Sequence, residues 1–225
     1  MTTGRTERGE RARGERGSSV LELMCVLLLM TIVLGAVFES IVSVEKATSG
    51  TGARLENLDE ARVLIATATR DVRTAVPLTA GTSPFVIADA NEIEFYGNLD
   101  TTAAPKLVHI YIDANHQLIE KVQDPDSPTR NPDQTKPPYT YTIKTPTLRM
   151  VGRFVANNAA NPIFTYLDDT GTALTPTPLS SANSLAVHDV AINLTVYKTS
   201  PFNQNATTLK NQVRLPNVDY NAVAN

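Results

Sequence analysis

The sequence predicts an α+β protein, with a long α-helical N-terminal part followed by a domain of antiparallel β-strands. Three observations predict this class. An uncharged apolar run extends from Leu23 to Phe38. A second helical pattern follows it, with apolar residues at steps of three and four, and ends at Pro77. Beyond Pro77 the period changes to two, and β-branched and aromatic residues gather in short runs.

Composition excludes several classes of function. The net charge of −3 is too small to predict a polyanionic partner, so direct nucleic-acid binding, which needs phosphate neutralisation, is not expected. Cys25 is the only cysteine, and an intramolecular disulfide is therefore impossible. Glu22, Leu23 and Met24 precede it, whereas a lipoprotein anchor needs a small residue directly before the cysteine.

The N-terminus combines a basic segment with an apolar one. Residues 1–17 contain five arginines and four glycines without apolar periodicity, and we expect them to be disordered. Residues 18–38, if helical, span about 30 Å, which matches the hydrocarbon core of a bilayer. The arginines precede the apolar run and none lies within it. The positive-inside rule therefore predicts a single-pass protein with a cytoplasmic N-terminus and an extracytoplasmic C-terminal domain.

Three interpretations of the apolar run compete. A secretory signal has a shorter apolar region followed by a small-residue cleavage site, which Val37-Phe38-Glu39-Ser40 does not provide. A plain signal anchor explains the length and the orientation but gives no reason for Glu22. A carboxylate at that depth costs several kcal/mol by insertion scales unless it is paired. Glu22 therefore favours a third interpretation.

The stretch from Glu15 to Leu23, ERGSSVLEL, resembles the prepilin signal of the type IV pilin and pseudopilin families. The resemblance implies that a prepilin peptidase cuts between Gly17 and Ser18 on the cytoplasmic side of the membrane. It also implies N-methylation of Ser18 and places Glu22 at the fifth mature position. The families usually have Phe or Met at the first mature position, from which Ser18 departs.

The resemblance also implies an organisation of the chain. Residues 1–17 would be the leader peptide, 18–52 the transmembrane and filament-core helix, and 53–225 the extracytoplasmic globular domain. One helix of about residues 18–76 would place its second half, 53–76, on an antiparallel β-sheet. We expect local loosening of this helix around Gly50 and Gly52.

The second half of the predicted helix carries one apolar stripe. Its members are Leu55, Leu58, Ala61, Ile65, Ala68, Val72 and Ala75. Charged residues, Asp71 among them, are expected mostly off the stripe. Glu56 and Glu60 form a like-charge pair at i,i+4, which disfavours a helix.

Nine strands are predicted beyond Pro77. They cover Phe85–Ala88, Glu92–Tyr96, Lys106–Asp113, Gln117–Gln123, Tyr139–Lys144, Thr147–Ala156, Pro162–Asp168, Leu185–Tyr197 and Thr207–Leu215. Asp113-Ala114-Asn115-His116 predicts a hairpin turn, and loops are predicted at Asp124–Pro138 and Thr175–Ser184. Two stretches, Pro162–Leu174 and Leu209–Asn217, resemble parts of the larger minor pilins and pseudopilins of the PilW-like and J-type group.

Little in the sequence predicts catalysis, and neither an enzyme nor a cofactor is expected. His109, His116 and His188 lack metal-ligand spacing. Asp168-Asp169-Thr170-Gly171 could bind calcium or form a tight turn. Two carboxylates are too few to fix a calcium site, which favours the turn.

The predicted function is therefore structural: a minor pilin or pseudopilin that assembles into or primes a type IV pilus-like filament. Its expected partners are other pilin-like subunits, a prepilin peptidase and the inner or cytoplasmic membrane. Two alternatives stay open. One is a pseudopilin of a type II secretion or DNA-uptake system, and the other is a membrane-anchored binding domain that never polymerises.

Overall fold

The computed structural model of the 225-residue chain describes residues 11–100, 104–133, 135–198 and 206–218, with side chains from residue 20 onward. The chain divides into two compact units, Met1–Thr51 and Gly52–Asn225. The first is helical over its described residues, and the second contains the β-sheets and the hydrophobic core. The predicted α+β class is thus confirmed.

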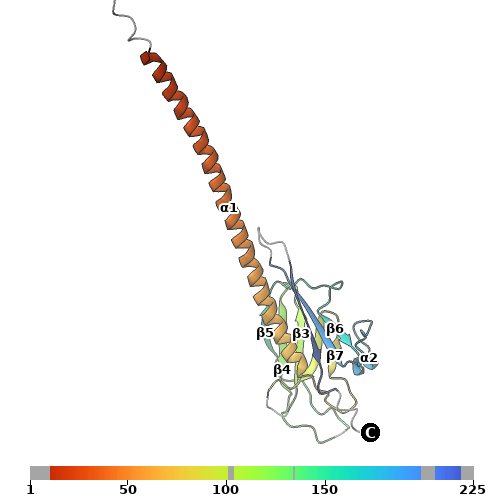
Figure 1. Ribbon diagram of the computed structural model, residues 1–225. Coiled ribbons are helices and arrows are strands. Elements are labelled where there is room, and N and C mark those ends of the chain that lie inside the picture. Colours follow the sequence, from red (N-terminus) through yellow and green to blue (C-terminus); the bar gives the residue numbers. More distant parts are fainter. Residues whose placement is uncertain (1–10, 101–103, 134, 199–205, 219–225) are drawn as a thin grey trace, which may run out of the picture. The chain divides into compact units, whose positions relative to one another are not determined.

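One helix, α1 (Arg11–Arg73), spans the boundary between the two units (Figure 1). Gly50 and Gly52 both lie in the helical backbone of α1, and the loosening expected around them stays a prediction. Each glycine costs only about 1 kcal/mol relative to alanine, which the surrounding helix-forming residues offset. Between the two glycines, the Thr51 hydroxyl donates a hydrogen bond of 2.8 Å to the carbonyl of Ala47.

The predicted disorder of residues 1–17 is also wrong in part. Residues 1–10 lie outside the described part of the chain, but α1 begins at Arg11 and runs through Gly17 without a break. Of the seven residues from Arg11 to Gly17, three arginines, one alanine and one glutamate are good helix formers, and two are glycines. Adding turns to an existing helix avoids the cost of nucleating a new one. The apolar helix therefore extends toward the N-terminus as far as Arg11.

The strands form two antiparallel sheets rather than one. The five-stranded sheet has the order β1-β2-β3-β4-β5, and the three-stranded sheet has the order β6-β7-β8. The strands are β1 (Phe85–Ala88), β2 (Glu92–Gly97), β3 (Lys106–Ile112), β4 (Leu118–Gln123), β5 (Thr147–Gly152), β6 (Phe164–Leu167), β7 (Asp189–Val196) and β8 (Thr207–Arg214).

The predicted hairpin turn between β3 and β4 is confirmed. Asp113 begins it and accepts hydrogen bonds through Oδ1 from the backbone N–H groups of Asn115 and Gln117. His116 has a positive φ of 57°, which closes the turn, and Ile112 then pairs with Leu118.

The predicted strand Tyr139–Lys144 is wrong. The backbone N–H groups of Thr142 and Ile143 point at the carboxylate of Asp126, at 3.0 and 2.8 Å. Since these donors are satisfied by one side chain, they are not available to a β-ladder. The hydrogen bonds, first those from Thr142, hold the pKa of the Asp126 carboxyl well below its usual range.

The predicted loop Thr175–Ser184 and the start of the predicted strand Leu185–Tyr197 also need correction. A short helix, α2 (Ser181–Leu185), occupies this junction, and β7 begins only at Asp189. Ser180 caps the helix, because its side chain accepts a hydrogen bond from the backbone N–H of Asn183. Serine is among the favoured N-cap residues, and the sequence analysis missed this signal.

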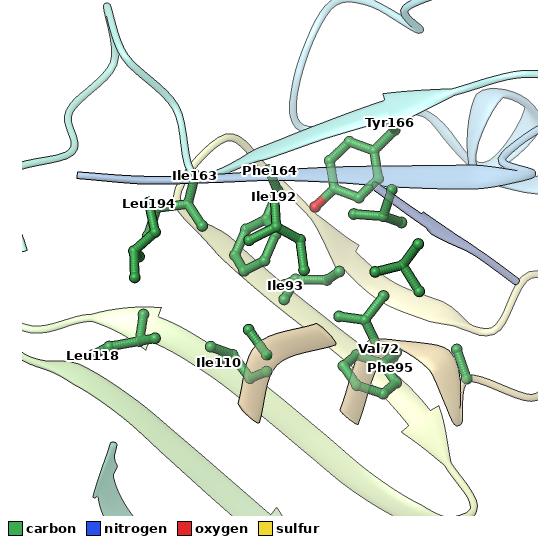
Figure 2. Close-up of a cluster of buried hydrophobic side chains, with 14 of the residues drawn as sticks. Val72, Ile93, Phe95, Ile110, Leu118, Ile163, Phe164, Tyr166, Ile192 and Leu194 are labelled. Carbon is green, nitrogen blue, oxygen red and sulfur yellow. The ribbon is translucent and has the colours of Figure 1, made fainter. Parts of the chain in front are cut away.

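The second half of α1 packs on the sheets. Ala61, Leu64, Ala68 and Val72 are buried on one face of the helix. Figure 2 shows Val72 of α1 close to Phe95 of β2 within a cluster to which both sheets contribute. Gly152 at the end of β5 permits the close approach, because a Cβ there would lie 2.5 Å from Cδ2 of Leu64.

The two sheets are joined beside the turn between β1 and β2. The rings of Phe85 and Tyr166 meet edge to face, with centroids 5.8 Å apart. The hydroxyl of Tyr166 donates to the carbonyl of Asp89 at 2.9 Å, and the backbone N–H of Phe164 donates to that of Ala90, also at 2.9 Å. The polar groups of this junction are therefore satisfied inside one continuous core.

Candidate functional site

The apolar segment of α1 is the most unusual surface in the described part of the chain. All fourteen large apolar side chains from Val20 to Phe38 are at least half exposed. By length and composition, this helix is able to cross a membrane. Soluble monomers rarely expose a contiguous apolar surface of this extent, and such a surface is typical of a segment that contacts lipid or other protein.

Thr31 is a polar residue within this segment, and its hydroxyl is satisfied by its own helix. The hydroxyl of Thr31 donates to the carbonyls of Leu27 and Leu28, at 2.8 and 2.9 Å. A threonine that bonds back to its own helix in this way is compatible with an apolar environment. Cys25 is exposed on the same segment as a free thiol.

Glu22 differs from these groups. It is the only ionisable carboxylic acid between Val20 and Phe38, and its side chain is exposed. It makes neither a hydrogen bond nor an ion pair with any of the described residues. Within the part of the chain whose side chains are described, the Glu22 carboxylate is therefore without a counter-charge.

The predicted cleavage site lies in the same helix. Gly17 and Ser18 are in the helical backbone of α1, and the side chain of Ser18 lies outside the described side chains. Ser18 and Glu22 are four positions apart, which puts them on one face of a helix. The structure therefore places the two predicted assembly positions one helical turn apart.

The predicted calcium candidates form a turn after β6. Oδ1 of Asp168 accepts hydrogen bonds from the backbone N–H and hydroxyl of Thr170 and from the N–H of Thr172, at 2.9, 2.6 and 2.8 Å. These bonds, first that from the Thr170 hydroxyl, lower the pKa of the Asp168 carboxyl. Gly171 has φ +80°, which glycine adopts without strain. Asp169 is exposed in the same turn. Among the described residues, no third acidic side chain joins the carboxylates of Asp168 and Asp169.

The histidines do not assemble into one site. His109 lies on β3, with Nε2 2.7 Å from a carboxylate oxygen of Glu92 on β2. His116 lies in the β3–β4 turn, and His188 directly precedes β7. Within the described ranges, no group of three or more His, Cys, Asp or Glu side chains is arranged to hold a metal ion.

The sequence analysis missed two buried polar residues on α1. Asn57 and Asp71 are both almost completely buried, whereas Leu55, expected in the apolar stripe, is exposed. The buried face of α1 therefore follows positions 57, 61, 64, 68 and 71–72, which recur with a period close to 3.6. The predicted stripe missed Asn57 and Asp71 because it was drawn through apolar residues alone. The Asp71 carboxylate accepts a hydrogen bond from Nε of Arg70 at 2.9 Å. Burial, and secondarily Glu120, raises its pKa.

Comparisons with known proteins do not assign the chain. No protein-family model matches it, and no curated protein matches it either.

Proposed function

We propose that this chain is the precursor of a minor pilin or pseudopilin, a structural subunit that assembles into or primes a type IV pilus-like filament. The observation that carries the proposal is Glu22, a carboxylate on an exposed apolar helix that has no partner among the described side chains. Glu22 lies five residues after Gly17. The stretch ERGSSVLEL resembles the prepilin signal, which has a glutamate at this position.

The continuity of α1 supports this proposal. A cut before Ser18 would leave the apolar helix attached to the globular domain, because residues 18–73 belong to one helix. An ordinary signal sequence would instead be lost with its apolar segment. The processed protein would thus keep both its membrane anchor and its means of packing against neighbouring helices.

Cleavage would also create the partner that Glu22 lacks. The new α-amine of Ser18 is a cation, and in a filament the amine of one subunit can donate charge-assisted hydrogen bonds to Glu22 of its neighbour. Neither charge is stable alone in an apolar core, but the two together can be accommodated there. A plain membrane anchor gains nothing from a carboxylate at this position.

The proposal includes a location and a set of partners. The basic segment before Ser18 would stay in the cytoplasm, and residues 53–225 would fold outside the inner or cytoplasmic membrane. The partners would be a prepilin peptidase and other pilin-like subunits, contacted through the N-terminal helix. A secretion or DNA-uptake pseudopilin uses the same chemistry and is the second form of the proposal, whereas a binding domain that never polymerises is its rival.

Processing in the native host tests this proposal. Intact mass of the membrane-extracted protein should correspond to residues 18–225, with or without one added methyl group. Gly17→Leu should block the cut, whereas Gly14→Leu, a matched change three residues upstream, should leave it intact. Full-length protein retaining residues 1–17 in peptidase-competent cells would contradict the prepilin assignment.

A further inference from the structure

A pocket of about 400 Å³ opens on the globular unit, between α1 and the segments that follow β5 and β7. The helix contributes Glu56, Asn57 and Glu60, among others, and the other two segments contribute Phe154 and Lys198. None of these residues belongs to the apolar segment or to the predicted cleavage site. The pocket is therefore a separate feature of the molecule.

The helix side of the pocket is acidic. Glu56 and Glu60 lie at i and i+4 on one face of α1, a like-charge arrangement that destabilises a helix by a few tenths of a kcal/mol. Asp59 also lines the pocket, but its carboxylate is paired with Arg62 at 3.3 Å, so Glu56 and Glu60 supply the excess charge. Lys198 is the one basic residue in the lining, so the pocket has an excess of negative charge and favours a cation.

The ammonium group of Lys198 already lies in this pocket. Nζ of Lys198 lies 2.6 Å from Oε2 of Glu56 and 5.8 Å from the centroid of the Phe154 ring. A carboxylate and an aromatic face around one ammonium group are the elements from which ammonium sites are built. Lys198 is partly exposed at this position, so a competing ammonium group can reach the same surroundings.

Phe154 is held in place by its backbone. It has φ +60°, a left-handed conformation that is uncommon for a bulky residue. Its carbonyl accepts from the N–H of Tyr197 at 2.8 Å, and the neighbouring N–H of Arg153 donates to Oε1 of Glu60, also at 2.8 Å. These bonds fix a ring that is 41% exposed at the pocket. Strained residues of this kind gather at functional sites.

The floor of the pocket is polar. Asn57 is 1% exposed, and its Oδ1 accepts from the backbone N–H of Lys198 at 3.3 Å. Its Nδ2 has no hydrogen-bond partner among the described residues, although buried amide donors are rarely left unpaired. A residue of the pocket lining therefore carries a donor that is not satisfied among the described residues.

We propose that this pocket binds a lysine residue presented by another polypeptide. The incoming ammonium group would replace that of Lys198 between the Glu56 carboxylate and the Phe154 ring, and its methylene stem would lie against Val63, which is exposed at the pocket. A backbone carbonyl of the partner would accept from Nδ2 of Asn57. The Lys198 side chain acts as an internal competitor, which keeps binding weak until a partner is presented at high local concentration.

The test is a titration of the isotope-labelled full chain in detergent micelles with the peptide acetyl-Gly-Lys-Gly-amide at low salt, followed by NMR. Amide signals of Asn57 and Phe154 should shift. The matching norleucine peptide, which lacks the charge, should leave these signals in place. Equal shifts with the norleucine peptide would overturn the proposal.

Two variants separate binding from folding. Lys198→Met keeps an unbranched side chain but removes the competing charge, and should tighten peptide binding about tenfold, whereas the matched Lys210→Met on β8 should change nothing. Phe154→Gly relieves the left-handed strain while removing the ring, so the domain should stay folded and peptide binding should fall severalfold. Unchanged or weaker binding by Lys198→Met, or undiminished binding by folded Phe154→Gly, would overturn the proposal. Neither result bears on prepilin processing, so the two proposals can fail separately.

Discussion

The two halves of α1 carry similar apolar side chains but expose them in opposite ways. Leu28, in the first half, is 62% exposed, whereas Leu64, in the second half, is completely buried. The second half finds its cover within the chain, in the core that both sheets form. The first half has no such cover among the described residues, and by length and composition it is able to cross a membrane.

The difference also concerns polar residues. In the second half of α1, one carboxylate oxygen of buried Asp71 accepts a hydrogen bond from Arg70, and Oδ1 of buried Asn57 accepts one from the backbone of Lys198. Glu22, in the first half, has no comparable contact among the described residues. The Glu22 carboxylate is exposed, so it would become costly only where lipid or protein covered it without supplying a partner.

The largest expected effect on the globular unit comes from its helix–sheet core. Leu64→Ala should lower the free energy of unfolding by about 2–5 kcal/mol, because it leaves a cavity under a fully buried side chain. Leu28→Ala, a chemically identical change in the first half, should leave the melting of the globular unit unchanged. Thermal unfolding of the full chain in micelles, followed by near-ultraviolet circular dichroism, measures both. Equal effects would contradict the division between the two halves.

A pair of glycine substitutions sharpens the comparison. A Cβ at Gly152 would lie 2.5 Å from Cδ2 of Leu64, so Gly152→Ala should destabilise the globular unit by about 1–3 kcal/mol. At Gly52 nothing lies within 4 Å of the added Cβ, and the backbone is helical. Gly52→Ala should therefore stabilise α1 by up to about 1 kcal/mol. Chemical denaturation should move the two midpoints in opposite directions, and destabilisation by Gly52→Ala would argue against a continuous helix.

The smallest effect concerns pH. Burial raises the pKa of the Asp71 carboxyl above its unfolded value of about 4, so its protonated form is favoured in the folded state. This contribution to stability is present below about pH 4 and is lost as the pH rises through the folded pKa. Asp71→Asn should therefore raise the melting temperature at pH 7 more than at pH 4.

The fold could be predicted from the sequence wherever a pattern was local. Period-two runs located β1 to its exact ends, and the Asp113–His116 turn followed from its residue types. The strand predicted at Tyr139–Lys144 failed because Asp126, a residue far from it in sequence, takes its N–H donors. The division into two sheets likewise depends on long-range pairing, which a single sequence does not display.

The candidate sites differ in the same way. Gly17, Ser18 and Glu22 form a local pattern, so they could be recognised from nine consecutive residues. The pocket could not, because Glu56, Phe154 and Lys198 come together only through the fold. The like-charge pair Glu56–Glu60 was the one sign of the pocket in the sequence, because like charges at i and i+4 disfavour a helix.

The central claim is that Glu22 is an assembly contact, and co-fractionation with sheared filaments in the native host tests it most directly. Glu22→Ala should reach the membrane at a normal level, since removing a carboxylate from an apolar helix does not hinder insertion. Its incorporation into filaments should fall by more than a hundredfold, because breaking a buried ion pair from one side costs about 3–5 kcal/mol. Glu39→Ala, at the far end of the apolar run, should incorporate normally. Normal membrane level with undiminished incorporation of Glu22→Ala would contradict the account.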